Sequence, residues 1–188
     1  NVTGRVDLLV NNAGISGPTA PVEAISPEAW QKTLDIGLTG AFNAARAVIP
    51  IMKAQGSGAI VNIASNAGLM GCPNRSPYVA AKWALIGLTK TWAMELGSYN
   101  VRVNALCPAS VEGARIDAVI ARDATARGVS EDAIRSVYER QSSLRAFTRV
   151  EDIAAMVCYL AGDQGIRISG QAIGIDGHTE TLANYLGP

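Results

Sequence analysis

The chain alternates short apolar runs with long stretches of helical hydrophobic spacing. The short runs, each bounded by turn signals, predict buried strands at 6–10, 59–63, 101–106 and 171–175. The long stretches predict helices at 27–54 and 78–96, two shorter helices within 112–147, and a last helix from Thr148 to about Gly162. This alternation predicts right-handed βαβ crossovers and a doubly wound parallel α/β sheet covered on both faces. Only four strands are found, whereas such sheets usually have about six.

Local signals mark where the helices begin and end. Ser26-Pro27 and Ser76-Pro77 each place an N-cap residue before a proline, and Ser130 caps the second helix of 112–147. Thr148-x-x-Glu151 matches a capping box, and Gly97 predicts the end of the helix 78–96. Apolar residues lie on nearly every side of the helix 78–96, so we expect most of its surface to be buried.

Composition excludes several classes of function. The 16 basic and 16 acidic side chains cancel, which argues against a nucleic-acid partner. No apolar run approaches the roughly 18 to 20 residues that cross a membrane. One histidine and three widely spaced cysteines make a metal site improbable, and we expect reduced thiols in a cytoplasmic protein.

A candidate acid–base pair lies at the start of the helix 78–96. Tyr78 and Lys82 are four residues apart, so their side chains project from one face of the helix. A free tyrosine titrates near pH 10, and a nearby ammonium stabilises the phenolate, as a general acid/base requires. Ser65 follows the second strand, at the edge of a parallel sheet where ligands bind, and could hydrogen-bond a carbonyl or alkoxide. The alternatives without a function are that Tyr78 and Lys82 are a solvent-exposed pair and that Ser65 is an ordinary loop residue.

These residues occur with two further motifs, Asn11-Asn12-Ala13-Gly14 after the first strand and Asn104-Ala105-Leu106-Cys107-Pro108 in the third. Together they closely resemble the short-chain dehydrogenase/reductase superfamily, from about Gly4 to Gly177. The resemblance implies reversible hydride transfer between NAD or NADP and an alcohol or carbonyl substrate. It implies that Tyr78 is the general acid/base, that Ser65 orients the substrate oxygen, and that Lys82 stabilises the phenolate and holds the nicotinamide ribose. The cofactor-binding residues that it implies are Asn11, Ala13, Gly14, Tyr78, Lys82, Pro108 and Val111, with no metal.

The chain also departs from the family pattern. Residues 1–188 contain no glycine-rich turn Thr-Gly-x-x-x-Gly-x-Gly, the segment that receives the pyrophosphate, and their strands correspond to the family's fourth to seventh. We therefore expect 1–188 to be the C-terminal part of a single Rossmann domain, with a substrate-loop insert at about 112–147. Gly37 stands where the family usually has an asparagine of its proton relay, and Ala109 and Gly113 replace a usual glycine and threonine. The usual Asp-Gly-Gly near the C-terminus is Asp176-Gly177-His178.

Three further expectations and two alternatives follow. The family resemblance and the apolar helices 27–54 and 78–96 suggest a homo-oligomer, a dimer or tetramer, packed through them. The arginines of the insert, Arg115 among them, could favour an anionic substrate, but we expect solvated faces balanced by acidic neighbours. We expect His178 to be a surface turn residue.

A non-catalytic subunit of the same fold is the main alternative function. A dehalogenase is a lesser alternative, and Lys82 argues against it because dehalogenases of this fold typically have arginine there.

Overall fold

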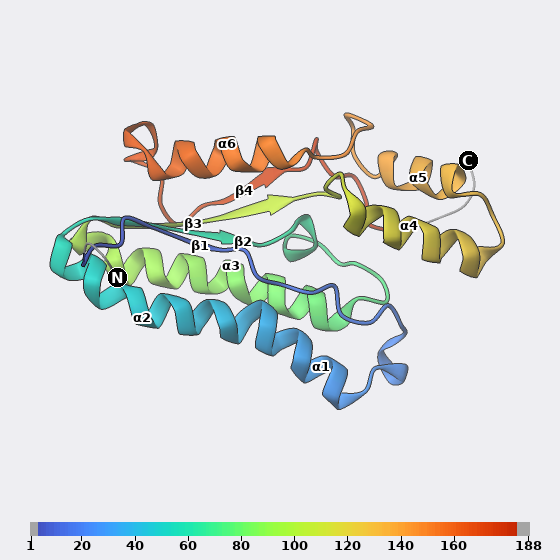
Figure 1. Cartoon of the computed structure of the whole chain (residues 1–188), viewed down its shortest axis with the longest axis horizontal. Helices are drawn as coiled ribbons and strands as arrows, with labels where there is room; N and C mark the ends of the chain where they lie inside the picture. Colours follow the sequence, from blue (N-terminus) through green and yellow to red (C-terminus); the bar gives the residue numbers. More distant parts are fainter. Residues whose placement is uncertain (1–3, 184–188) are drawn as a thin grey trace.

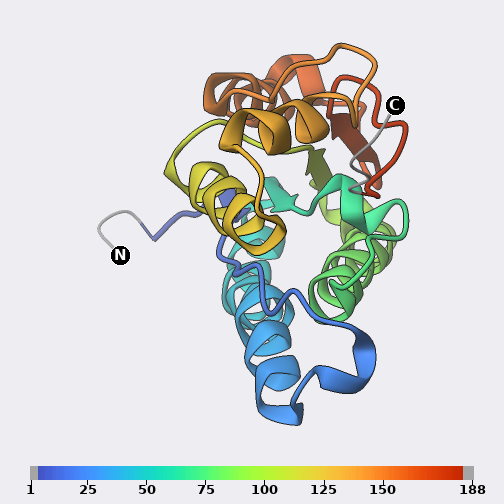
Figure 2. The ribbon, with the colours of Figure 1, turned by 90° about the vertical axis from the view of Figure 1, so that its right-hand side faces the viewer.

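The four apolar runs pair into one parallel sheet in a computed structural model of the protein, which describes residues 4–183 (Figure 1). The strands lie in the order of the sequence: β1 (Leu8–Asn11), β2 (Gly58–Ile63), β3 (Val101–Pro108) and β4 (Ala172–Ile175). The α/β fold class and the four predicted strands are thus confirmed. All four carboxyl ends meet at one edge of the sheet, toward the viewer in Figure 2.

The predicted helix 27–54 forms as two α-helices joined by a wider turn. Its parts are α1 (Pro27–Leu34), the π-helical turn η2 (Asp35–Thr39) and α2 (Gly40–Gln55). The Ser26 hydroxyl accepts a hydrogen bond from the backbone of Ala29 at 3.2 Å, as its N-cap position predicts. The π turn has no sequence signal of its own, because nothing in the hydrophobic spacing distinguishes it from α-helix.

The long central helix is α3 (Ser76–Leu96), and it ends where the sequence predicted. Gly97 follows it with right-handed backbone, however, and a short turn, η4 (Gly97–Tyr99), then leads to Asn100 with φ of 56°. The left-handed residue that ends the helical path is therefore an asparagine, a residue that tolerates this conformation better than most.

The insert contains the two expected helices, α4 (Ala114–Arg127) and α5 (Glu131–Glu139), with the Ser130 hydroxyl accepting from the backbone of Ala133. The predicted capping box at Thr148 is wrong. Helix α6 (Val150–Ala161) is capped by Arg149, whose backbone N–H donates to Asp152 at 3.1 Å. The Thr148 hydroxyl instead donates to the carbonyl of Ile175 at 2.7 Å, because the end of β4 lies beside it.

Helices cover both faces of the sheet (Figure 1). On one face, Met52 of α2 and Trp92 of α3 pack with Ile60 of β2 in a buried cluster. On the other face, Leu160 of α6 packs with Val61 of β2. Consecutive residues of β2 therefore serve opposite cores, which explains why this strand is apolar throughout.

The third crossover differs from the expectation of right-handed connections throughout. The strands are parallel and sequential, and the helices of the first two crossovers lie on one face while α6 lies on the other. The connection from β3 through α6 to β4 therefore has the opposite hand to the first two. The long excursion 109–149, which contains α4 and α5, separates β3 from α6 and gives the chain the length to change faces.

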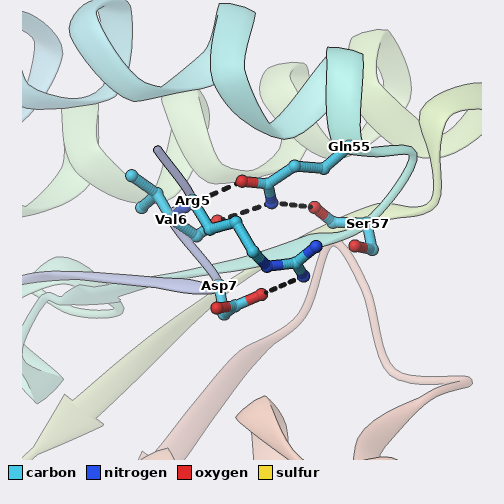
Figure 3. Close-up of polar contacts among 5 residues, drawn as sticks. All are labelled: Arg5, Val6, Asp7, Gln55 and Ser57. Atoms are coloured by element: carbon cyan, nitrogen blue, oxygen red, sulfur yellow. Dashed lines mark hydrogen bonds and ion pairs between the residues drawn. The ribbon is translucent and has the colours of Figure 1, made fainter. Parts of the chain in front are cut away.

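The segment before β1 is held by a side chain (Figure 3). Gln55, the last residue of α2, accepts from the Val6 amide at 2.8 Å and donates to the Val6 carbonyl at 2.9 Å. An ion pair joins Arg5 and Asp7 at 2.7 Å. These contacts fix the direction in which the chain enters the sheet.

Within residues 4–183, β1 pairs only with β2, so its other edge has no partner strand there. Leu8 and Val10 on this strand are each 38% exposed. Among the same residues, no helix has the length and apolar character required to span a bilayer.

Candidate active site

The predicted catalytic residues gather at the carboxyl edge of the sheet. Ser65 lies two residues beyond the end of β2, and Tyr78 lies in the first turn of α3, which starts beside that edge. Lys82 follows on the next turn of the same helix, with its Nζ 5.6 Å from the centre of the Tyr78 ring. The tyrosine is half-buried.

Lys82 is a buried cation, with 5% of its surface exposed. Its Nζ donates a hydrogen bond to the carbonyl of Ile63, the last residue of β2, at 2.8 Å. Burial, together with a smaller effect of the positive charge of Arg115, lowers the pKa of Lys82 to about 8. The ammonium is thus held against the end of the sheet at a site that disfavours its charge.

Ser65 begins the short turn η3 (Asn66–Gly68), and its hydroxyl accepts from the backbone of Ala67 at 3.2 Å. The same hydroxyl donates to Oδ1 of Asn66 at 3.1 Å, and Asn66 Nδ2 donates to Oγ1 of Thr179 at 3.0 Å. No hydrogen bond between Ser65 and Tyr78 occurs among residues 4–183. The serine hydroxyl is therefore oriented by a buried chain of contacts that comes from the far end of the sequence.

Cys107 lies beneath this site and is fully buried on β3. Burial raises the pKa of its thiol to about 11, although a hydrogen bond from the backbone of Ser65 acts in the opposite direction. The thiol is therefore protonated at neutral pH, and its sulfur helps to fix the backbone of Ser65 rather than acting as a nucleophile.

The residues expected to line the cofactor pocket lie along the same edge, in different environments. Asn11 is buried, and its Nδ2 donates to Oδ1 of Asn62 at 2.8 Å, so it ties β1 to β2. Gly14 lies beside the lysine, since a Cβ added there would be 3.5 Å from Lys82 Nζ. Ala13 is exposed on the same loop.

On the far side, Pro108 ends β3 and is buried, whereas Val111 is half-buried and pairs with Thr148 in an isolated bridge. The fold thus brings all the predicted site residues to one edge. Their contact with a cofactor stays a prediction.

Gly37 lies in the π turn and packs against α3. A Cβ added there would be 3.5 Å from the Cβ of Ala81, which is an ordinary contact. The position where the family usually has asparagine is therefore beside the residue that precedes Lys82, and there is room for a Cβ there.

The insert arginines follow the expectation only in part. Arg127 pairs with Asp123, and Arg135 pairs with Asp117, each at 2.6 Å. Arg115 instead contacts the loop after β1, with its Nη2 3.4 Å from Oγ of Ser16. Arg115 is solvated as expected, but it has no carboxylate within ion-pair distance in the described part of the chain.

Sequence reasoning assigned no role to three residues near the site: Asn66, Arg75 and Thr179. Each acts through a partner far away in the chain, which no local spacing signals. His178, as expected, lies exposed in a turn, where its Nδ1 is 2.7 Å from the Ser143 hydroxyl.

The chain matches the family model described as enoyl-(acyl carrier protein) reductase over residues 1–178. It is 38% identical over 175 residues to D-beta-hydroxybutyrate dehydrogenase of Rhizobium meliloti, covering 93% of this chain and 67% of that protein. It is 40% identical over 183 residues to trans-4-hydroxycyclohexanecarboxylate dehydrogenase of Sinomonas cyclohexanicum, covering 97% and 63%.

Solved structures agree with these relatives. The structure of NAD⁺-bound xylitol dehydrogenase superposes with a TM-score of 0.85 at 32% identity, covering 92% of this chain and 68% of that one. The structure of 4-hydroxyisoleucine dehydrogenase complexed with NADH gives a TM-score of 0.76 at 35% identity, with the same coverage. The chain belongs to the short-chain dehydrogenase/reductase superfamily and spans about two-thirds of the length of these relatives.

Proposed function

We propose that the protein transfers a hydride between NAD or NADP and an alcohol or carbonyl substrate, with Tyr78 as general acid/base. The observation that carries this proposal is the buried Lys82 ammonium, 5.6 Å from the centre of the Tyr78 ring at the carboxyl edge of the sheet. A charge buried without a carboxylate partner costs stability, so its presence is more easily explained by chemistry than by folding.

Each residue has a distinct part in the reaction. In alcohol oxidation the Tyr78 phenolate takes the hydroxyl proton, and in carbonyl reduction the phenol returns it to the substrate oxygen. The Lys82 ammonium stabilises the negative charge on the phenolate. Ser65, released from Asn66, donates its hydroxyl hydrogen to the substrate oxygen and orients it.

The described residues fit the nicotinamide end of the cofactor. Lys82 has three N–H donors, of which the Ile63 carbonyl uses one. Gly14 leaves the space beside the lysine free, because a Cβ there would lie 3.5 Å from Nζ. When bound, the nicotinamide accepts or supplies the hydride. Lys82 would hold its ribose, while Pro108 and Val111 would border the ring.

The second candidate function is a non-catalytic subunit of the same fold. Gly37 favours it, since this position carries no side chain that could join a proton relay, whereas the assembled Ser65, Tyr78 and Lys82 favour the enzyme. Cofactor titration by nicotinamide fluorescence and turnover measurements separate the two candidates.

The test compares Tyr78→Phe with Tyr159→Phe, which alters an exposed tyrosine on α6. Oxidation of a panel of secondary alcohols and hydroxy acids is followed by nicotinamide absorbance with NAD⁺ and NADP⁺. We expect Tyr78→Phe to lower kcat by about 10²- to 10⁴-fold and Tyr159→Phe to leave it unchanged. Equal turnover in both variants would remove Tyr78 from the mechanism.

Two expectations about assembly and location belong to this proposal. A homo-oligomer packed through the helices α1, α2 and α3 is supported by large apolar side chains exposed on them, Phe42 at 46%, Trp83 at 50% and Met94 at 86%. A monomer in light scattering at micromolar concentration would contradict it. A reducing, cytoplasmic location is supported by the free thiols of Cys72, Cys107 and Cys158.

A further inference from the structure

Two arginines contact Ser16, and one of them lies against the ring of the proposed catalytic tyrosine. Arg75, the residue before α3, has its guanidinium carbon 5.0 Å from the centre of the Tyr78 ring. Its Nη2 donates to the backbone carbonyl of Ser16 at 3.1 Å. Its Nε is buried and has no hydrogen-bond partner. A buried N–H without a partner is rare and costs about 1–3 kcal/mol, more when the group is charged, so this donor calls for an acceptor.

Arg115 approaches the same place from the other side. It lies in the first turn of α4 and is exposed, and its Nη2 reaches the Ser16 hydroxyl at 3.4 Å. Its charge also lowers the pKa of Lys82, which places it near the buried ammonium. Ser16 is thus contacted by both guanidinium groups, one at its carbonyl and one at its hydroxyl.

Neither arginine of this cluster forms an ion pair with a carboxylate of the described residues. In the described part of the chain, five other arginines pair with carboxylates within 4.0 Å, whereas Arg75 and Arg115 do not. Asp176 is close enough to the site to act on Cys107. Both of its carboxylate oxygens already accept backbone hydrogen bonds, from His178 and Thr179, at 3.2 Å each.

We propose that Arg75 and Arg115 form a carboxylate-binding subsite, and that the substrate is therefore a small hydroxy acid or the corresponding keto acid. Guanidinium groups bind carboxylates through paired, charge-assisted hydrogen bonds, and the free Nε of Arg75 lies on the fork that makes such pairs. Because Arg75 stacks on the Tyr78 ring, the carboxylate is only a few bonds from the carbon that loses its hydride. This inference rests on the proposed function, in which the hydride goes to the nicotinamide and the proton to Tyr78.

The activity test compares hydroxy acids with matching alcohols that lack the carboxylate, in the wild type, Arg75→Gln, Arg115→Gln and the control Arg122→Gln. Arg122 is exposed on α4 and donates to the Ala118 carbonyl. We expect each site variant to lower kcat/KM for hydroxy acids by about 10- to 100-fold, mostly through KM. Turnover of neutral alcohols should fall much less than turnover of hydroxy acids, and the control variant should match the wild type on both. Equal losses on charged and neutral substrates would overturn the proposal.

A binding test keeps this inference separate from the catalytic proposal. Calorimetric titration with butyrate, butyramide and inorganic phosphate requires no turnover. We expect butyrate to bind the wild type and not the double variant of Arg75 and Arg115, and butyramide to bind neither. If butyrate binds but no substrate is oxidised, the subsite stands and the proposed function fails. If phosphate binds more tightly than butyrate and the variants raise KM for the cofactor, the arginines serve a cofactor phosphate and the proposal is wrong.

Discussion

Replacing the buried lysine should stabilise the protein while abolishing its chemistry. Burial lowers the pKa of Lys82 from 10.5 to about 8. At about 1.4 kcal/mol per pKa unit, this shift corresponds to about 3 kcal/mol of native-state free energy spent on holding the charge. In Lys82→Met the apolar stem remains and the charge is gone. The Ile63 carbonyl, however, loses its donor at 2.8 Å, which costs about 1 kcal/mol. We expect a net gain of about 2 kcal/mol at pH 7.

The gain should depend on pH in one direction. Below pH 8 the ammonium is charged in both states, so only the native state of the wild type bears the burial cost. Between about pH 8 and 10.5 the native lysine loses its proton while the unfolded lysine keeps it, so wild-type stability rises with pH. The advantage of Lys82→Met therefore shrinks across this window and becomes a net loss of about 1 kcal/mol at its upper end, where only the lost hydrogen bond to the Ile63 carbonyl remains.

The assay is urea unfolding followed by circular dichroism at pH 7 and pH 10, together with turnover at pH 7. Lys90→Met is the matched control, because Lys90 is exposed on the same helix. We expect the control to change the unfolding free energy by less than about 0.5 kcal/mol at both pH values. A destabilised Lys82→Met at pH 7, or an effect that is the same at pH 10, would refute the reasoning.

Two further substitutions test the surroundings of the site. Thr179→Val removes the acceptor of Asn66 Nδ2, so we expect a loss of about 1–2 kcal/mol in urea unfolding and a roughly tenfold lower kcat with little change in KM, with recovery in Thr179→Ser. Unchanged kcat would show that this contact does not orient Ser65. Gly37→Asn should fit beside Ala81, with an unfolding free energy within about 1 kcal/mol of the wild type. Its turnover should rise several-fold by completing a proton relay, and a stability loss above about 2 kcal/mol would show that the side chain has no room.

The parts of the fold that the sequence predicted are those specified locally. Serine–proline pairs marked the starts of α1 and α3, and four apolar runs became the four strands. Motif positions at strand ends also placed Ser65, Tyr78 and Lys82 at one edge, because parallel strands share that edge.

What could not be predicted depends on partners distant in the chain. Thr148 has the sequence of a capping residue, but the Ile175 carbonyl lies beside it and takes its hydroxyl. Arg115 lies in a charged stretch that is typical of a solvated helix face, yet its guanidinium contacts Ser16, 99 residues away in the chain. The opposite hand of the last crossover likewise depends on which face α6 packs against, and hydrophobic periodicity does not distinguish the faces of a sheet that is apolar on both sides.

Because the sheet is apolar on both faces, three buried polar side chains, Asn11, Asn62 and Thr89, are important for the alignment of its strands. Strands such as β1 and β2 would bury nearly as much apolar surface if they slipped along each other, so hydrophobicity alone leaves their alignment weakly specified. Asn11 lies opposite Asn62 in the ladder and donates to it, and Asn62 donates in turn to the Thr89 hydroxyl of α3. Any slipped alignment would bury these amides without partners. The three side chains therefore favour the native alignment of β1 and β2, on which the position of the catalytic edge depends.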